Sequence, residues 1–83
     1  MPRPAWSHEA VRILATLPIP VQIDILSKSR LLSEFPEVYP VRWRGRFRGQ
    51  RFFISFEWLV YYVIQHDDAV AITTIGHGRR KGA

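Results

Sequence analysis

The chain has 83 residues with a formal net charge of +5, and 47% of its residues are hydrophobic while 23% are charged. This balance excludes a disordered chain, and the length suits one domain, residues 1–83, around one core. The absence of cysteine excludes a disulfide-stabilised secreted domain and favours the cytoplasm. The longest apolar run, Trp58 to Ile64, is too short to span a bilayer and the N-terminus lacks a signal-peptide pattern, so no membrane contact is expected.

The positive charge is confined to the second half of the chain. Residues 1–40 contain four basic and four acidic side chains, whereas residues 41–83 contain eight basic and three acidic ones. This asymmetry predicts a polyanionic partner, either nucleic acid or an acidic protein segment.

Two helices are predicted over about residues 7–35, joined at Pro18-Ile19-Pro20. Ser7 suits the N-cap of the first helix, and Pro20 suits the first position of the second, which would end before Pro36. Helical spacing directs these residues toward the core: Ala10, Val11, Ile13, Leu14 and Leu17 in the first helix, and Val21, Ile25, Leu26, Leu32 and Phe35 in the second. The short link predicts an antiparallel helical hairpin.

The hydrophobic period changes from helical to two at Val41. From Val41 to Arg48 every even position is arginine, and the odd positions are Val, Trp, Gly and Phe. We expect a strand with a bend at Gly45, its odd positions on the core and its arginines in a row on the other face.

Three further strands are predicted at residues 51–56, 58–64 and 69–75, with a turn at Gln65–Asp68. The tyrosines of the central strand, Tyr61 and Tyr62, would point to opposite faces, one into the core and the other toward the arginines. The order predicts an α+β fold, with the helical hairpin packed on a twisted antiparallel four-stranded sheet over about residues 41–75. A short edge strand at Arg3 to Trp6 is compatible with Pro2 and Pro4, and residues 76–83 would form a flexible basic tail.

The arginine row is the first candidate binding surface. Arginine forks match phosphate oxygens, and four same-side arginines without an acidic neighbour favour an anionic partner over a merely solvated face.

Glu57, Trp58 and His77 form the second candidate. Adjacent strands would bring Glu57 and His77 together as an acid–base pair, and Trp58 could stack on a base. On spacing alone, a core tryptophan and a solvated tail histidine are the favoured interpretation. The three histidines show no metal-ligand spacing, so no metal or cofactor is expected.

Several segments together resemble the RelE/ParE superfamily of bacterial type II toxin–antitoxin toxins. They are Leu31–Pro36, Arg46–Gly49, Trp58–Ile64 and Ile75–Arg80, which occur in the superfamily's order and with its gaps. The resemblance implies a helical hairpin on a twisted antiparallel sheet, an acidic cognate antitoxin as partner, and growth arrest. RelE-like and YafQ-like members cleave mRNA on the ribosome, whereas ParE-like members inhibit DNA gyrase.

The resemblance leaves these two targets open. The RelE pattern has a catalytic arginine where this chain has Trp58, and a late tyrosine that this chain lacks. Glu57-Trp58 and the adjacent Gly76-His77 resemble the YafQ-like arrangement, in which one residue separates the glycine from the histidine. The segment His77–Arg80 also resembles the end of ParE-like members, and a degenerate RNA-binding homologue is a third interpretation.

Ribosome-dependent mRNA cleavage is the preferred hypothesis, with the ribosome and mRNA as partners and DNA gyrase as the alternative. It assigns catalysis to His77, Glu57, Arg79 and Arg80, and RNA binding to Arg42, Arg44, Arg46, Arg48, Arg51, Trp58 and Lys81.

Overall fold

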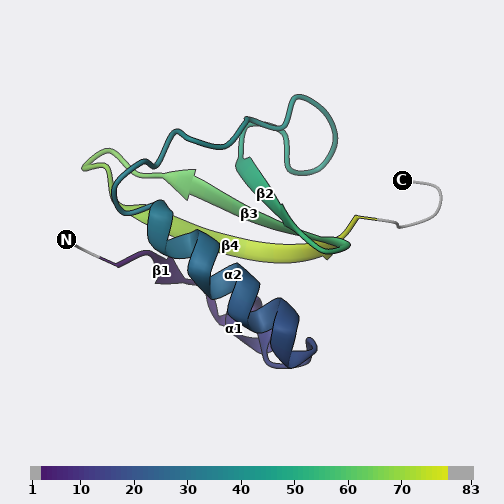
Figure 1. The fold of residues 1–83 in the computed structure, drawn as a ribbon. Coiled ribbons are helices and arrows are strands. Elements are labelled where there is room, and N and C mark those ends of the chain that lie inside the picture. Colours follow the sequence, from purple (N-terminus) through teal and green to yellow (C-terminus); the bar gives the residue numbers. More distant parts are fainter. Residues whose placement is uncertain (1–2, 79–83) are drawn as a thin grey trace.

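The computed structural model describes residues 3–78, which form two helices and a four-stranded sheet (Figure 1). Along the chain the elements are β1 (Ala5–Trp6), α1 (His8–Leu14), α2 (Ile19–Leu31), β2 (Arg51–Ser55), β3 (Trp58–Ile64) and β4 (Val70–His77). The strand order is β1-β4-β3-β2. The predicted α+β class is confirmed, but the sheet is mixed, because β1 pairs with β4 in parallel. Among the described residues no helix is long and apolar enough to cross a membrane.

Both helices lie on one face of the sheet and enclose the hydrophobic core against it (Figure 1). Helix α1 begins after Ser7, whose Oγ accepts a hydrogen bond from the Ala10 amide at 3.0 Å and donates one to the Thr73 carbonyl at 2.6 Å. Ser7 therefore caps the helix and also attaches it to β4. Glu9 adds a second link to β4 by accepting a hydrogen bond from the Thr74 hydroxyl.

Helix α2 is shorter than predicted, since it ends at Leu31 and residues 32–34 form turns. Pro20 is its second residue rather than its first. Phe35 is exposed because the chain leaves the helix before reaching it. Val11 and Leu26 are exposed as well, because each follows the residue that faces the sheet and so points about 100° away from it. The other predicted core residues are buried or half-buried, with Ala10, Ile25 and Leu32 fully inaccessible.

The predicted strand over residues 41–48 is wrong, and this segment is a loop that precedes β2. Only Val41 forms an isolated bridge, to Arg51. Gly45 and Gly49 have φ angles of +83° and +92°, which favour glycine, and the Gly49 amide donates to the Arg42 carbonyl at 2.9 Å. The chain therefore curls back on itself, and the even-numbered arginines form no row on a strand. The fourth strand is β1, at the edge where the prolines permitted one.

The two tyrosines of β3 point to opposite faces of the sheet, as predicted. Tyr62 is fully buried in the core beneath the helices, and its hydroxyl donates to the Pro36 carbonyl at 2.8 Å. Burial raises the pKa of the Tyr62 phenol. Tyr61 lies on the other face, where the ring of Phe47 stacks on it with a centroid distance of 4.3 Å. The loop of residues 41–50 thus covers part of the face that the helices leave open (Figure 1).

The strand ends define the part of the sheet that carries the candidate site. The turn between β3 and β4 follows the prediction, with the Gln65 amide donating to the Ala69 carbonyl at 2.7 Å. Strands β2 and β3 are joined by only two residues, Phe56 and Glu57. Strand β4 extends to His77, so Gly76 and His77 belong to the sheet and not to the predicted tail.

Candidate active site

The register of β3 and β4 brings the predicted acid–base residues together at the end of the sheet. Trp58, the first residue of β3, pairs directly with His77, the last residue of β4. Glu57 precedes Trp58 in the tight turn, and its Oε2 lies 3.5 Å from Nε2 of His77. Residues 20 positions apart in the chain are therefore ion-pair neighbours when His77 is protonated.

Trp58 supports the His77 ring from within the sheet. The two rings meet edge to face, with centroids 4.7 Å apart and an interplanar angle of 88°. Trp58 is half-buried and packs against the hydrophobic core, so it provides a firm surface for the imidazole. The side chains of His77 and Glu57 are 38% and 51% exposed, which leaves both within reach of a substrate.

A close backbone contact holds the chain beyond His77 against the turn. The Gly78 amide donates to the Glu57 carbonyl at 2.7 Å. A Cβ atom at position 78 would lie 3.1 Å from that same carbonyl oxygen, tighter than most such contacts. Glycine therefore allows the approach that keeps Glu57 beside the end of β4.

Phe56 adopts a backbone conformation that bulky side chains rarely occupy. Its φ is +56°, and its side chain is 63% exposed. The first central residue of a two-residue hairpin turn commonly requires positive φ, for which glycine is the favoured residue. The turn that carries Glu57 therefore contains local strain, which the paired strands on both sides maintain.

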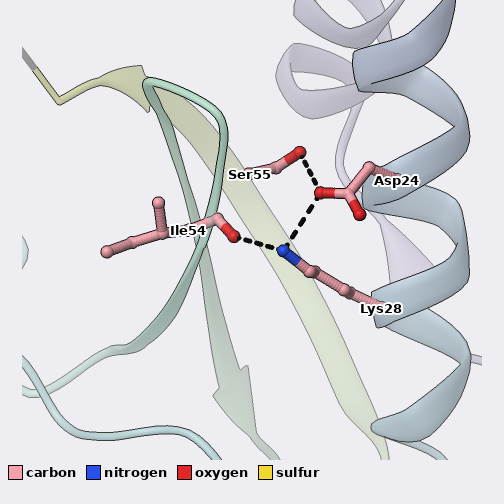
Figure 2. Close-up of polar contacts among 4 residues, drawn as sticks. All are labelled: Asp24, Lys28, Ile54 and Ser55. Atoms are coloured by element: carbon pink, nitrogen blue, oxygen red, sulfur yellow. Dashed lines mark hydrogen bonds and ion pairs between the residues drawn. The ribbon is translucent and has the colours of Figure 1, made fainter.

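A polar network behind the turn attaches the end of β2 to helix α2 (Figure 2). The fully buried Ser55 donates to Oδ2 of Asp24 at 2.6 Å, and Lys28 Nζ lies 3.0 Å from the same oxygen. Lys28 also donates to the Ile54 carbonyl at 2.8 Å. The hydrogen bond from Ser55 and the contact with Lys28 hold the pKa of Asp24 below its usual value. The sequence interpretation missed this network, although the i,i+4 spacing of Asp24 and Lys28 indicates a helical ion pair.

The arginines assigned to RNA binding fall into different environments. Arg51 is engaged within the protein, since Nη1 donates to the carbonyls of Tyr39 at 2.6 Å and Glu37 at 3.4 Å. Arg42 and Arg46 lie near aromatic rings of the face opposite the helices, 5.8 Å from the centroid of Phe52 and 5.6 Å from that of Phe47.

Arg44, Arg46 and Arg48 are exposed in the loop. The basic loop precedes the first residue of β2 and Glu57 follows its last, so the loop and the Glu57–His77 pair adjoin opposite ends of this strand. Arg79, Arg80 and Lys81 lie outside the described residues.

Two solved structures have the same fold as this chain. The isolated RelE toxin of E. coli superposes with a TM-score of 0.76 at 16% identity, over 96% of this chain and 87% of that one. A chain of the intact E. coli RelBE toxin–antitoxin complex superposes with a TM-score of 0.74 at 14% identity, over 94% of this chain and 98% of that one. No protein-family model and no curated protein sequence matches the chain. The fold that the resemblance implied, a helical hairpin on a sheet, is thereby confirmed.

Proposed function

We propose that this chain is the toxin of a type II toxin–antitoxin pair and that it arrests growth by cleaving mRNA on the ribosome. The observation that carries the proposal is the contact of His77 with Glu57, at 3.5 Å, on the half-buried surface of Trp58. An imidazole and a carboxylate, both partly exposed, are groups suited to proton transfer near neutral pH. The RelE fold supports the toxin class.

Cleavage of RNA without a metal ion requires a base, an acid and positive charge. The 2′-oxygen attacks the adjacent phosphorus and the bond to the 5′-oxygen breaks, which leaves a 2′,3′-cyclic phosphate and a 5′-hydroxyl. In this proposal His77 either takes the 2′-hydroxyl proton or gives a proton to the departing 5′-oxygen, and water completes the other transfer. Glu57 either takes the place of water in accepting the 2′-hydroxyl proton or orients the His77 imidazole, and the 3.5 Å contact favours the orienting role.

Trp58 has two possible roles at this site. Its edge contact with His77 and its packing against the core favour a role in positioning the imidazole over stacking on a base.

Arginine side chains would supply the positive charge at the phosphates. Arg44, Arg46 and Arg48 are exposed in the loop and available for this role, and Arg79, Arg80 and Lys81 complete the proposed cationic set. Arg51 is the weakest member, because its guanidinium already binds the carbonyls of residues 37 and 39.

The proposed partners follow from charge and fold. The solved RelBE structure is a toxin–antitoxin complex, and an acidic antitoxin suits a chain of net charge +5. We propose that this toxin acts in the cytoplasm, on mRNA at the ribosome.

Primer extension on mRNA from translating cells tests the proposal. Induction of the chain should stop growth and produce discrete cuts within codons, and both should disappear when the antitoxin is co-expressed. The cuts should also disappear when translation initiation is blocked. Intact mRNA together with falling DNA supercoiling would instead show a gyrase inhibitor, and normal growth with soluble protein would refute the toxin class.

His77→Ala is the central variant for the mechanism. Because His77 is partly exposed at the end of a strand, we expect it to abolish cleavage and growth arrest with little change in the thermal midpoint. His66→Ala, in the exposed turn between β3 and β4, is the matched control and should remain toxic. A folded and fully toxic His77→Ala would remove the catalytic role.

A further inference from the structure

The loop of residues 41–50 displays a tryptophan that the hydrophobic pattern placed in the core. Trp43 is 80% exposed, the highest exposure among the large hydrophobic side chains of the described residues. The other aromatic residue of the loop, Phe47, is half-buried and stacks on Tyr61. One aromatic side chain thus anchors the loop while the other faces solvent.

The exposure of Trp43 does not result from a lack of local order. The Arg42 amide donates to the Gln50 carbonyl at 2.8 Å and the Gly49 amide donates to the Arg42 carbonyl at 2.9 Å, so the two ends of the loop are joined. Thr73 of β4 donates to the side-chain oxygen of Gln50 at 2.5 Å. The loop therefore holds Trp43 outward from a defined base on the sheet.

Trp43 forms one wall of an open, mainly apolar hollow of about 470 Å³. The other residues that line it are Pro40, Val41, Arg42, Arg44 and Phe52. Arg42 lies over the Phe52 ring, so a cation and two aromatic surfaces border the same space. A flat, apolar group that carries negative charge at its edge fits these walls.

The charge around the hollow has one sign. Between Glu37 and Glu57 the sequence contains five arginines and no acidic residue. Arg44, Arg46 and Arg48 are exposed on the loop that carries Trp43. A polyanion that also presents flat rings would match both the charge and the walls of this hollow.

We infer that this hollow binds single-stranded RNA, with Trp43 stacked on an unpaired base and Arg44 on a neighbouring phosphate. Unpaired bases are needed because a tryptophan reaches the face of a base only when that base is unstacked from its neighbours. An acidic peptide would satisfy the arginines but would leave the indole face without a flat partner. This inference rests on the proposed function and deepens it by naming a specificity site distinct from Glu57 and His77.

Fluorescence titration with a 2′-O-methyl oligoribonucleotide of about ten residues tests the inference. The methylated oligonucleotide cannot be cleaved, so binding is measured apart from catalysis. The chain has three tryptophans, Trp6, Trp43 and Trp58, and stacking on Trp43 should quench the emission. Trp43→Phe should abolish most of the quenching and retain most of the affinity, whereas Trp6→Phe, the matched control, should keep the quenching.

Trp43→Ala should weaken binding by about 5- to 150-fold, the usual effect of losing one stacked base, without lowering the slope against salt. Arg44→Ala should instead lower that slope by about 0.7, the value for one lost contact to a single strand. Unchanged affinity of folded Trp43→Ala would overturn the inference. So would a Trp43→Ala variant that loses binding of an acidic peptide while RNA affinity is unchanged.

Two results separate this inference from the proposed function. If His77→Ala binds the oligonucleotide as the parent does and Trp43→Ala does not, the hollow is confirmed whether or not the chain cleaves mRNA. If the chain cleaves mRNA and Trp43→Ala binds and cuts like the parent, the inference is wrong and the proposed function stands.

Discussion

The end of the β3–β4 ladder and the loop of residues 41–50 carry the candidate chemistry in two different ways. At the ladder end, strand pairing places His77 opposite Trp58 and beside Glu57, with the core beneath them. The loop is attached to the sheet by a few contacts, chiefly Phe47 on Tyr61 and Gln50 on Thr73.

The difference suits the chemistry proposed for each region. Proton transfer requires atoms held within a few tenths of an ångström, which paired strands provide. Phosphate binding by arginine tolerates motion, because charge acts over several ångströms and the side chain is long. In this proposal the paired strands position the acid–base pair closely, and the loop brings arginine side chains to the phosphates.

After His77→Ala, the largest effect is expected from the carboxylate at the ladder end. Glu57→Gln keeps the shape of the side chain and removes its charge, so cleavage should slow by about 10²- to 10⁴-fold if Glu57 takes part in proton transfer. Single-turnover cleavage on ribosomes measures this, with thermal unfolding as the check on folding. Glu34→Gln, an exposed glutamate of the turns after α2, is the control. A Glu57→Gln rate within twofold of the parent would leave His77 acting without it.

The network behind the ladder end should contribute to stability. Ser55→Ala removes a buried hydrogen bond to a carboxylate and should lower the free energy of unfolding by about 1–3 kcal/mol. The network lowers the pKa of Asp24 in the folded state. The contribution of the network to the free energy of unfolding is therefore fully present at pH values above the ordinary aspartate pKa, 3.8. It is lost as the pH falls through the lower folded value.

Urea unfolding of the parent and of Ser55→Ala measures this network at pH 7 and below pH 4. The difference between the two proteins should shrink in acid. A constant difference would show that the Asp24 carboxylate is not what Ser55 stabilises.

Two arginines of the basic segment should differ in how much they contribute to the stability of the protein. Arg51→Ala removes the guanidinium that binds the carbonyls of residues 37 and 39 and should destabilise the protein by about 1–2 kcal/mol. Arg44→Ala, on the exposed loop, should change stability by less than about 0.5 kcal/mol. Thermal unfolding of both variants distinguishes them, and equal midpoints would contradict the structural role of Arg51.

The smallest effect is expected at the strained residue of the turn. Phe56→Gly removes the cost of a positive φ, and because the side chain is 63% exposed little burial is lost. The free energy of unfolding should rise by up to about 1 kcal/mol, since the greater freedom of glycine in the unfolded chain offsets part of the relief. Phe56→Ala keeps the Cβ atom and should show no gain in a urea titration. An equal gain in both variants would mean that the turn is unstrained.

The sequence by itself determined the helical pair and the strands β2 to β4. It offered the meeting of Glu57 with His77 only as a hypothesis, because it placed His77 in a tail beyond the last strand. Each helix and strand follows from local patterns: a serine cap and prolines for the helices, and β-branched and aromatic runs for the strands. Adjacent antiparallel strands bring the start of one beside the end of the other, which is why the pair could be proposed from the sequence.

Tertiary structure decided what local period could not. The alternating arginines of residues 42–48 predicted a strand. In the structure Gly45 and Gly49 adopt left-handed conformations, and the fourth strand is β1, which pairs with β4. Because this segment has no strand partner along its length, it forms a loop. In this loop Phe47 stacks on Tyr61, whereas Trp43 is exposed. Periodicity reports which side chains share a face, whereas pairing and burial depend on residues distant in the chain.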